Sequence, residues 1–219
     1  MRVLRDNGLT IFLLVLTSAT IIGMLFTGWS VNNEEIAQHG GAALSLANYA
    51  VSGHFLSALF ENWESEFLQM SAYVMLTAML FQCGSAESKD PDQSASQDED
   101  PAGKAGNPDA PWAVRTGGLV RALYSYSLGI ALAALFVASF VLHLRYSALA
   151  ENTEAAMHGQ PVQSIMEHLT SGKFWFESFQ NWQSEFLSTA VIVVLSIFLR
   201  FRGSPESKPV AAPHSETGS

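Results

Sequence analysis

Two pairs of glutamate and histidine have the residue types and the spacing of metal ligands. Glu35 and His39 lie four residues apart, and Glu154 and His158 repeat that spacing. Residues four apart share a helix face, and carboxylate and imidazole groups bind zinc and other divalent metals. Helix capping explains the same residues, because glutamate favours the first turn, histidine the last turn, and Gly40 a C-terminal stop. We therefore expect no metal site and keep these four residues as weak candidates.

A second set of polar residues stands at the start of an apolar segment in each half of the chain. The motif Asn-Trp-x-Ser-Glu-Phe occupies residues 62–67 and recurs at 181–186. Its polar residues fall at i, i+3 and i+4, which places them on one face of a helix. They form a candidate polar site: Asn62, Ser65, Glu66, Asn181, Ser184 and Glu185.

The depth of Glu185 in a membrane separates two interpretations of this motif. If the span ends at Arg200 and covers about 20 residues, Glu185 lies roughly 8 Å inside the outer hydrocarbon edge. A carboxyl group there is a functional candidate, and pseudosymmetry then predicts that Glu66 and Glu185 approach each other near the outer surface. In the alternative, both glutamates lie among the headgroups, and Trp63 and Trp182 are interfacial anchors.

No catalytic constellation accompanies these residues. Cys83 is the sole cysteine, which excludes an intrachain disulfide and a cysteine-based zinc site. The sequence has no glycine-rich phosphate loop and no His-Glu-x-x-His motif, and its basic residues do not cluster with aromatic ones. We expect no enzyme activity, no catalytic residue, no cofactor and no nucleic-acid partner.

The chain contains an internal duplication. Residues 2–89 align without a gap onto residues 121–208, and roughly a third of the aligned positions are identical. Gly53 falls on Gly172 and Trp63 on Trp182. A duplicated unit has to be recognised before a fold is inferred, and here it predicts two similar halves.

The composition predicts a membrane protein. The chain is 48% hydrophobic and only 14% charged, whereas soluble domains carry about a quarter charged residues. Uncharged segments of about 20 residues are long enough to cross the hydrocarbon. Each half supplies one such segment and one shorter apolar run, at 67–83 and 186–199, whose helix must include residues of the Asn-Trp-x-Ser-Glu-Phe motif to span the membrane. The four predicted spans are at about 8–29, 62–83, 122–144 and 181–201.

The basic residues predict the orientation. Lys and Arg residues precede the first span, lie between the second and third spans, and follow at the end of the fourth. The loops inside the two halves contain only Arg145 and Lys173. By the positive-inside rule, both termini and the central linker are cytoplasmic, and the two halves enter the membrane in the same direction as a parallel repeat.

Four segments follow from this division. Residues 1–85 form the first hairpin repeat and residues 115–204 the second. The acidic linker 86–114 and the tail 205–219 are rich in polar residues, proline and glycine, and such composition cannot offset the entropy of ordering. We expect both segments to be disordered.

The motifs also resemble those of a known family. Asn-Trp-x-Ser-Glu-Phe, the repeated Gly-Ser-x-Glu-Ser-Lys at 84–89 and 203–208, His-Gly followed by Ser-Gly-x-Phe, and the linker ending 107–112 are similar to an uncharacterised bacterial membrane-protein family, a domain of unknown function. The resemblance covers nearly the whole chain. It implies a small bacterial inner-membrane protein and carries no substrate, cofactor or catalytic residue.

We therefore predict an all-α polytopic membrane protein with four transmembrane helices in two tandem parallel hairpins. Small residues should line the helix contacts: Ala19, Gly23, Ala131, Ala134 and Ala138. The expected function is a non-enzymatic scaffold or accessory subunit. The alternatives are a small transporter or channel subunit with a paired-glutamate site near the outer face, and a metal-binding membrane protein. The expected partners are the lipid bilayer and either further copies of the chain or another membrane protein.

Overall fold

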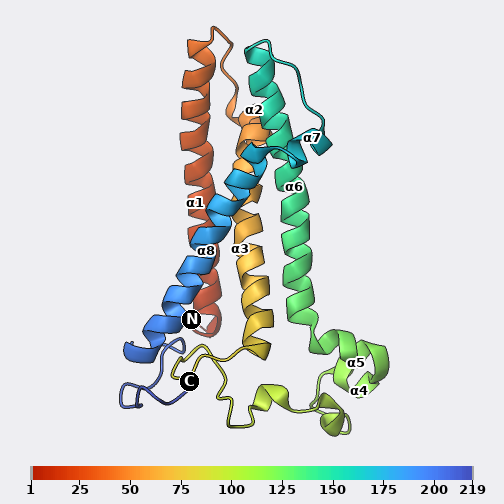
Figure 1. Ribbon diagram of the computed structural model, residues 1–219, viewed down its shortest axis with the longest axis vertical. Helices are drawn as coiled ribbons and strands as arrows, with labels where there is room; N and C mark the ends of the chain where they lie inside the picture. The colour runs from red at the N-terminus through yellow and green to blue at the C-terminus, as the bar shows by residue number, and fades with distance from the viewer. Residues whose placement is uncertain (1, 219) are drawn as a thin grey trace. The chain divides into compact units, whose positions relative to one another are not determined.

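The computed structural model describes residues 2–218. These residues form helices joined by loops, without any strand. The all-α fold class is confirmed. Figure 1 labels the helices along the chain. In order they are α1 (Arg2–Gln38), α2 (Leu46–Ala50), α3 (Gly53–Met79), η1 (Ser96–Asp98), η2 (Pro101–Lys104), α4 (Trp112–Thr116), α5 (Gly118–Ser125), α6 (Ser127–Met157), α7 (Ile165–Leu169) and α8 (Gly172–Phe198).

Three of these helices, α1, α6 and α8, are long and apolar enough to cross a membrane. Helix α3 has the same length as α8, 27 residues, but it is not among the three. It contains Glu61, Glu64 and Glu66, and its uncharged part begins only at Phe67. A fourth span therefore stays a prediction.

The described chain forms two compact units. Unit 1 contains Met1–Phe60 and Val141–Trp175, and unit 2 contains Glu61–Phe140 and Phe176–Ser219. Each unit combines segments from both predicted repeats. The expected division into two hairpins flanking a disordered linker and followed by a disordered tail stays a prediction. In the structure the linker carries η1, η2 and the start of α4.

The helix boundaries recur at the spacing of the duplication. Helices α1 and α6 end at Gln38 and Met157, which are 119 positions apart (157 − 38). The bounds of α2 and α7, and those of α3 and α8, differ by the same number at both ends. Non-helical backbone also recurs, at Asn7 (φ −131°) in α1 and at Tyr126 (φ −116°) between α5 and α6.

The loop after the first helix of each half is fixed in the same way. Asn33 accepts a hydrogen bond from the Leu44 amide (2.8 Å) and donates to its carbonyl (3.1 Å). Asn152 makes the same two bonds with Gln163, at 2.8 and 2.9 Å. Ser45 and Ser164 then cap α2 and α7. These asparagines and serines satisfy backbone groups at helix ends that would otherwise lack partners.

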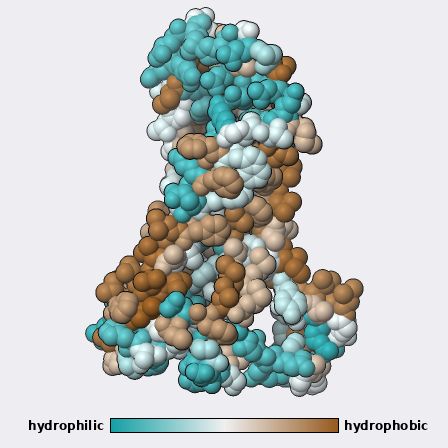
Figure 2. All heavy atoms as spheres, viewed as in Figure 1, coloured by the Kyte–Doolittle hydropathy of each residue, from teal (hydrophilic) through white to brown (hydrophobic). Residues whose placement is uncertain are grey.

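The prediction that small apolar residues line contacts within the chain was wrong. All five of the alanines and glycines named for it are exposed. A close approach occurs instead at Gly53 in unit 1, where a Cβ atom would lie 2.6 Å from the Ala150 amide nitrogen of α6. The apolar faces of the helices remain uncovered, as Figure 2 shows by the hydrophobic side chains along α8. Lipid can cover such faces, because it is as apolar as a leucine side chain.

Candidate functional site

The candidate polar motif lies in unit 2, where the side chains of α3 and α8 bond to each other. The indole N–H of Trp182 donates to Glu64 Oε1 over 2.9 Å. Asn181 Nδ2 donates to Glu61 Oε1, and Gln69 Nε2 donates to Thr189 Oγ1. We call this row of contacts the α3–α8 seam. It is made by Glu61, Glu64 and Gln69 on α3 and by Asn181, Trp182 and Thr189 on α8.

Glu64 is the most enclosed member of the seam. Its relative exposure is 0%, and the aromatic ring of its donor is itself packed against other rings. The Trp182 ring centroid lies 5.5 Å from that of Phe179 and 6.3 Å from that of Phe136. A buried polar group costs free energy unless it is hydrogen-bonded, and Trp requires an acceptor for its N–H when buried. The single hydrogen bond between Trp182 and Glu64 therefore gives the buried carboxyl group a donor and the indole N–H an acceptor.

The two glutamates predicted from the sequence, Glu66 and Glu185, are less buried than Glu64. Glu66 is exposed and Glu185 is half-buried. The approach of these two carboxyl groups to each other near the outer surface stays a prediction. Asn181, a member of the candidate polar site, donates to Glu61 and to the Glu177 carbonyl.

The remaining predicted residues differ in burial between the two copies of the motif. Ser65 is buried and donates to the Asn62 carbonyl (2.9 Å), whereas Ser184 is exposed and donates to the Asn181 carbonyl (2.8 Å). Asn62 is exposed. Of the two proposed interfacial anchors, Trp63 is 37% exposed, while Trp182 is half-buried and bonded within the seam.

Sequence reasoning missed Glu61 and Glu64. The comparison of the two halves selected identical residues, and positions 61 and 64 are matched by Gln180 and Gln183. The seam joins a carboxyl group from one copy to an N–H donor from the other, so its members need not repeat. The usable signal was the buried-tryptophan rule: a Trp entering an apolar segment requires an acceptor nearby.

Trp182→Phe should destabilise the protein by about 1–3 kcal/mol, because it removes a donor from a buried carboxyl group. Thermal unfolding in detergent, followed by circular dichroism, measures the change. Trp63→Phe is the matched control, since it alters the equivalent and more exposed ring. Equal losses in the two variants would show that ring packing rather than the bond to Glu64 stabilises the seam.

A second polar contact lies in unit 1, between α6 and α7. Ser147 Oγ lies 2.8 Å from His168 Nε2, and both residues are buried. Burial lowers the pKa of His168 below its ordinary value, and His143 and Lys173 act in the same direction against an opposing effect of Glu151. The equivalent positions in the first half are Gly28 and Tyr49, and a Cβ atom at Gly28 would collide with the Tyr49 hydroxyl.

The lowered pKa of His168 predicts a loss of stability in acid. The unfolded chain binds the proton more readily, so the stabilisation is fully present above about pH 6.5 and falls as the pH decreases below that value. The melting temperature measured from pH 8 to pH 5 should therefore decline. The double variant Ser147→Gly with His168→Tyr, which installs the Gly–Tyr pair of the first half, should decline less. An unchanged decline would exclude His168 as its cause.

The weak metal candidates are brought together only in part. The rings of His39 and His158 have centroids 4.9 Å apart. Glu154 instead lies 3.7 Å from the Lys173 ammonium group. Within residues 2–218, no group of three or more His, Cys, Asp or Glu side chains is arranged to hold a metal ion. The four weak candidates are therefore not assembled into one set of ligands.

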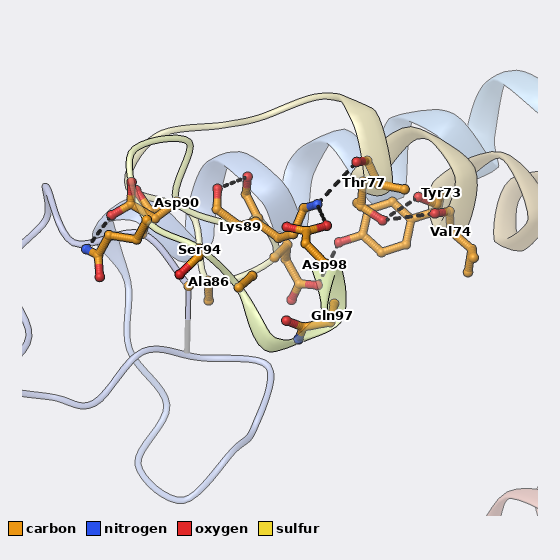
Figure 3. Close-up of a pocket in the computed structure, with 16 residues that line it drawn as sticks. Tyr73, Val74, Thr77, Ala86, Lys89, Asp90, Ser94, Gln97 and Asp98 are labelled. Atoms are coloured by element: carbon orange, nitrogen blue, oxygen red, sulfur yellow. Dashed lines mark hydrogen bonds and ion pairs between the residues drawn. The ribbon is translucent and has the colours of Figure 1, made fainter. Parts of the chain in front are cut away.

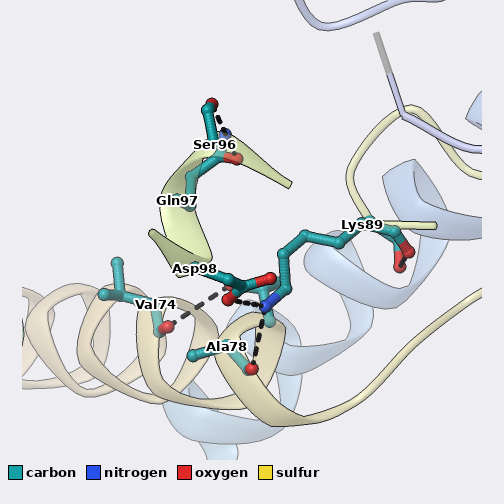
Figure 4. Close-up of polar contacts among 8 residues, drawn as sticks. Val74, Ala78, Lys89, Ser96, Gln97 and Asp98 are labelled. Carbon is teal, nitrogen blue, oxygen red and sulfur yellow. Dashed lines mark hydrogen bonds and ion pairs between the residues drawn. The ribbon is translucent and has the colours of Figure 1, made fainter. Parts of the chain in front are cut away.

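The repeated Gly-Ser-x-Glu-Ser-Lys motif folds back on the ends of its helices. In unit 2 a pocket of about 690 Å³ forms where residues 86–98 meet the last turns of α3 (Figure 3). Lys89 Nζ lies 2.7 Å from Asp98 Oδ1 and donates to the Ala78 carbonyl at 3.3 Å (Figure 4). A cation at a helix C-terminus offsets the dipoles of the last carbonyl groups, so this loop caps α3.

The second copy of the motif uses its lysine differently. Lys208 is buried, and its ammonium group donates to the carbonyl oxygens of Pro213, His214 and Glu216. Burial lowers the pKa of Lys208, and Arg200 acts in the same direction. The lysine thus binds the tail that follows it.

Comparison with known proteins places the chain in a family without assigning an activity. A family model described as a domain of unknown function (DUF6766) matches residues 1–219. No curated protein and no solved structure matches the chain.

Proposed function

Since the chain belongs to this family of domains of unknown function, we propose from its own residues that it is a membrane scaffold or accessory subunit. The observation that supports this proposal is the α3–α8 seam. Asn181 and Trp182 of the second motif copy donate hydrogen bonds to Glu61 and Glu64 of α3, and Glu64 is fully buried. Groups used in this way hold helices together.

We propose that the membrane arrangement consists of four spans, with α3 as the fourth, in two tandem parallel hairpins. The recurrence of the helix bounds at a spacing of 119 residues supports a duplicated hairpin. The seam supports a membrane position for α3, because α3 pairs through it with α8, which is long and apolar enough to span. The basic residues support an orientation with both termini and the linker in the cytoplasm, and the resemblance of the motifs supports a bacterial inner membrane as the location.

The proposal includes the absence of catalysis. The polar groups of the seam, of the His168 contact and of the Lys89 loop are bonded in ways that fix helices and loops. The exposed apolar side chains of the three long helices suit lipid, further copies of the chain or another membrane protein.

Reporter fusions test the four-span arrangement. A reporter joined after Ser94 or after Ser219 should read cytoplasmic, and one after Gly41 should read external. If α3 does not cross the membrane, the Ser94 fusion lies on the same side as the Gly41 fusion. An external signal from Ser94 would therefore overturn both the fourth span and the parallel repeat.

One feature favours transport as a second candidate: Glu66 and Glu185 are carboxyl groups at equivalent positions of the two motif copies, and Glu185 is half-buried. Carboxyl groups inside a membrane protein suit a cation or proton site. Four spans are few for a transport path, so this function would require several copies of the chain.

Flux through reconstituted vesicles distinguishes the two functions. We expect vesicles containing the wild-type protein to show the same proton and potassium leak as vesicles containing Glu66→Gln with Glu185→Gln, because a scaffold conducts neither ion. Both proteins should insert at equal levels, since Gln keeps the size of the side chain. A wild-type flux that the double variant lacks would overturn the scaffold proposal in favour of transport.

A further inference from the structure

Two equivalent histidines of the duplication contact each other in unit 1. His39 follows the last residue of α1, and His158 follows the last residue of α6. Their ring centroids are 4.9 Å apart and their planes make an angle of 77°. Both side chains are exposed, so an ion in solution has direct access to them.

The same ring nitrogen is engaged in both residues. His39 Nδ1 lies 2.9 Å from the Glu35 carbonyl oxygen, and His158 Nδ1 lies 2.9 Å from the Glu154 carbonyl oxygen. A carbonyl oxygen only accepts, so in each neutral ring Nδ1 carries the hydrogen and Nε2 carries the lone pair. A backbone carbonyl that fixes the tautomer in this way is the usual outer-shell partner of a metal-binding histidine.

The distance between the rings suits two ligands of one ion. A metal–nitrogen bond of about 2.0–2.1 Å places each ring centroid about 3.2 Å from the metal. Two such rings with centroids 4.9 Å apart subtend an angle of about 100° at the ion, between the octahedral and tetrahedral values. The spacing thus meets the distance requirement for shared ligation.

We propose that His39 and His158 bind one divalent transition-metal ion, of the class Cu²⁺, Ni²⁺ or Zn²⁺, through their Nε2 atoms. Imidazole nitrogen suits these ions, and water fills the positions that the protein leaves open. The glutamates of the two Glu-x-x-x-His pairs contribute their backbone carbonyls as outer-shell acceptors. The ion would link the ends of α1 and α6, which come from different halves of the duplication. This site does not depend on the scaffold proposal.

Titration of the full-length protein with each metal alone tests the site. The protein is purified in detergent through a tag without histidine, and calorimetry should give one ion per chain, with Cu²⁺ bound most tightly. His39→Ala and His158→Ala should each weaken binding by about tenfold or more, since even an outer-shell contact is worth roughly that factor. The two losses should be similar, because either change leaves a single ligand.

His214→Ala is the matched control. His214 is also exposed, and its Nδ1 likewise lies 3.0 Å from a helix carbonyl, that of Ile197, but it has no histidine partner in the described contacts. This variant should bind the metal as the wild type does. Equal binding by the wild type and both His39→Ala and His158→Ala would overturn the proposal, as would two independent sites each lost with one histidine.

Electron paramagnetic resonance of the Cu²⁺ complex gives a second readout that does not depend on affinity. The wild-type spectrum should show coupling to two imidazole nitrogens, and each single variant should show coupling to one. Circular dichroism of the metal-free variants confirms that they remain folded. A wild-type spectrum with one coupled imidazole would contradict shared ligation.

Discussion

The bond between Trp182 and Glu64 is the interaction on which the pairing of α3 with α8 depends. A buried carboxyl group without a donor is costly, and Glu64 is completely enclosed. Helices α3 and α8 therefore cannot separate, or slide by a turn, without breaking the hydrogen bond between this group and the indole N–H. Apolar contacts impose no such requirement in lipid, where a helix gains little by exchanging lipid for leucine. The polar row fixes the register of two helices whose other faces are free to meet lipid.

The sequence predicted local structure in part. Gly40 stops its helix as expected, since α1 ends at Gln38 and Gly40 has a φ angle of 74°, but the first-turn position expected for Glu35 was wrong, because α1 runs on from Arg2. The duplication anticipated that the two halves would share helix ends, and the bounds of α3 and α8 coincide in register. The asparagines, capping serines and left-handed glycines act within about one loop of their own position. Gly84 and Gly203, for example, have φ angles of 83° and 88° and end the segments after α3 and α8.

The sequence predicted the partners of the candidate site poorly. Glu66 and Glu185 were chosen because they are identical in the two halves, yet Glu61 and Glu64 hold the helices together. Small residues were expected at helix contacts, but Ala131 and Ala138 are exposed and Gly53 makes the close approach. The missed glutamates and the wrong helix contacts have one cause. A helix pattern shows which residues share a face, and only the tertiary structure shows which helix that face meets.

Identical and different residues of the two halves have separate roles. Identical residues fix loops, as Asn33 and Asn152 do, since the same loop requires the same bonds. Contacts between the halves join different residues, as Trp182 and Glu64 do, because a hydrogen bond requires a donor facing an acceptor. His39 and His158 break this rule, since two identical rings meet. Because both Nδ1–H groups are engaged by backbone carbonyls, the two rings keep only their Nε2 lone pairs for a partner, and a metal ion accepts a lone pair from both. A shared ion is therefore the partner that makes identical ligands complementary.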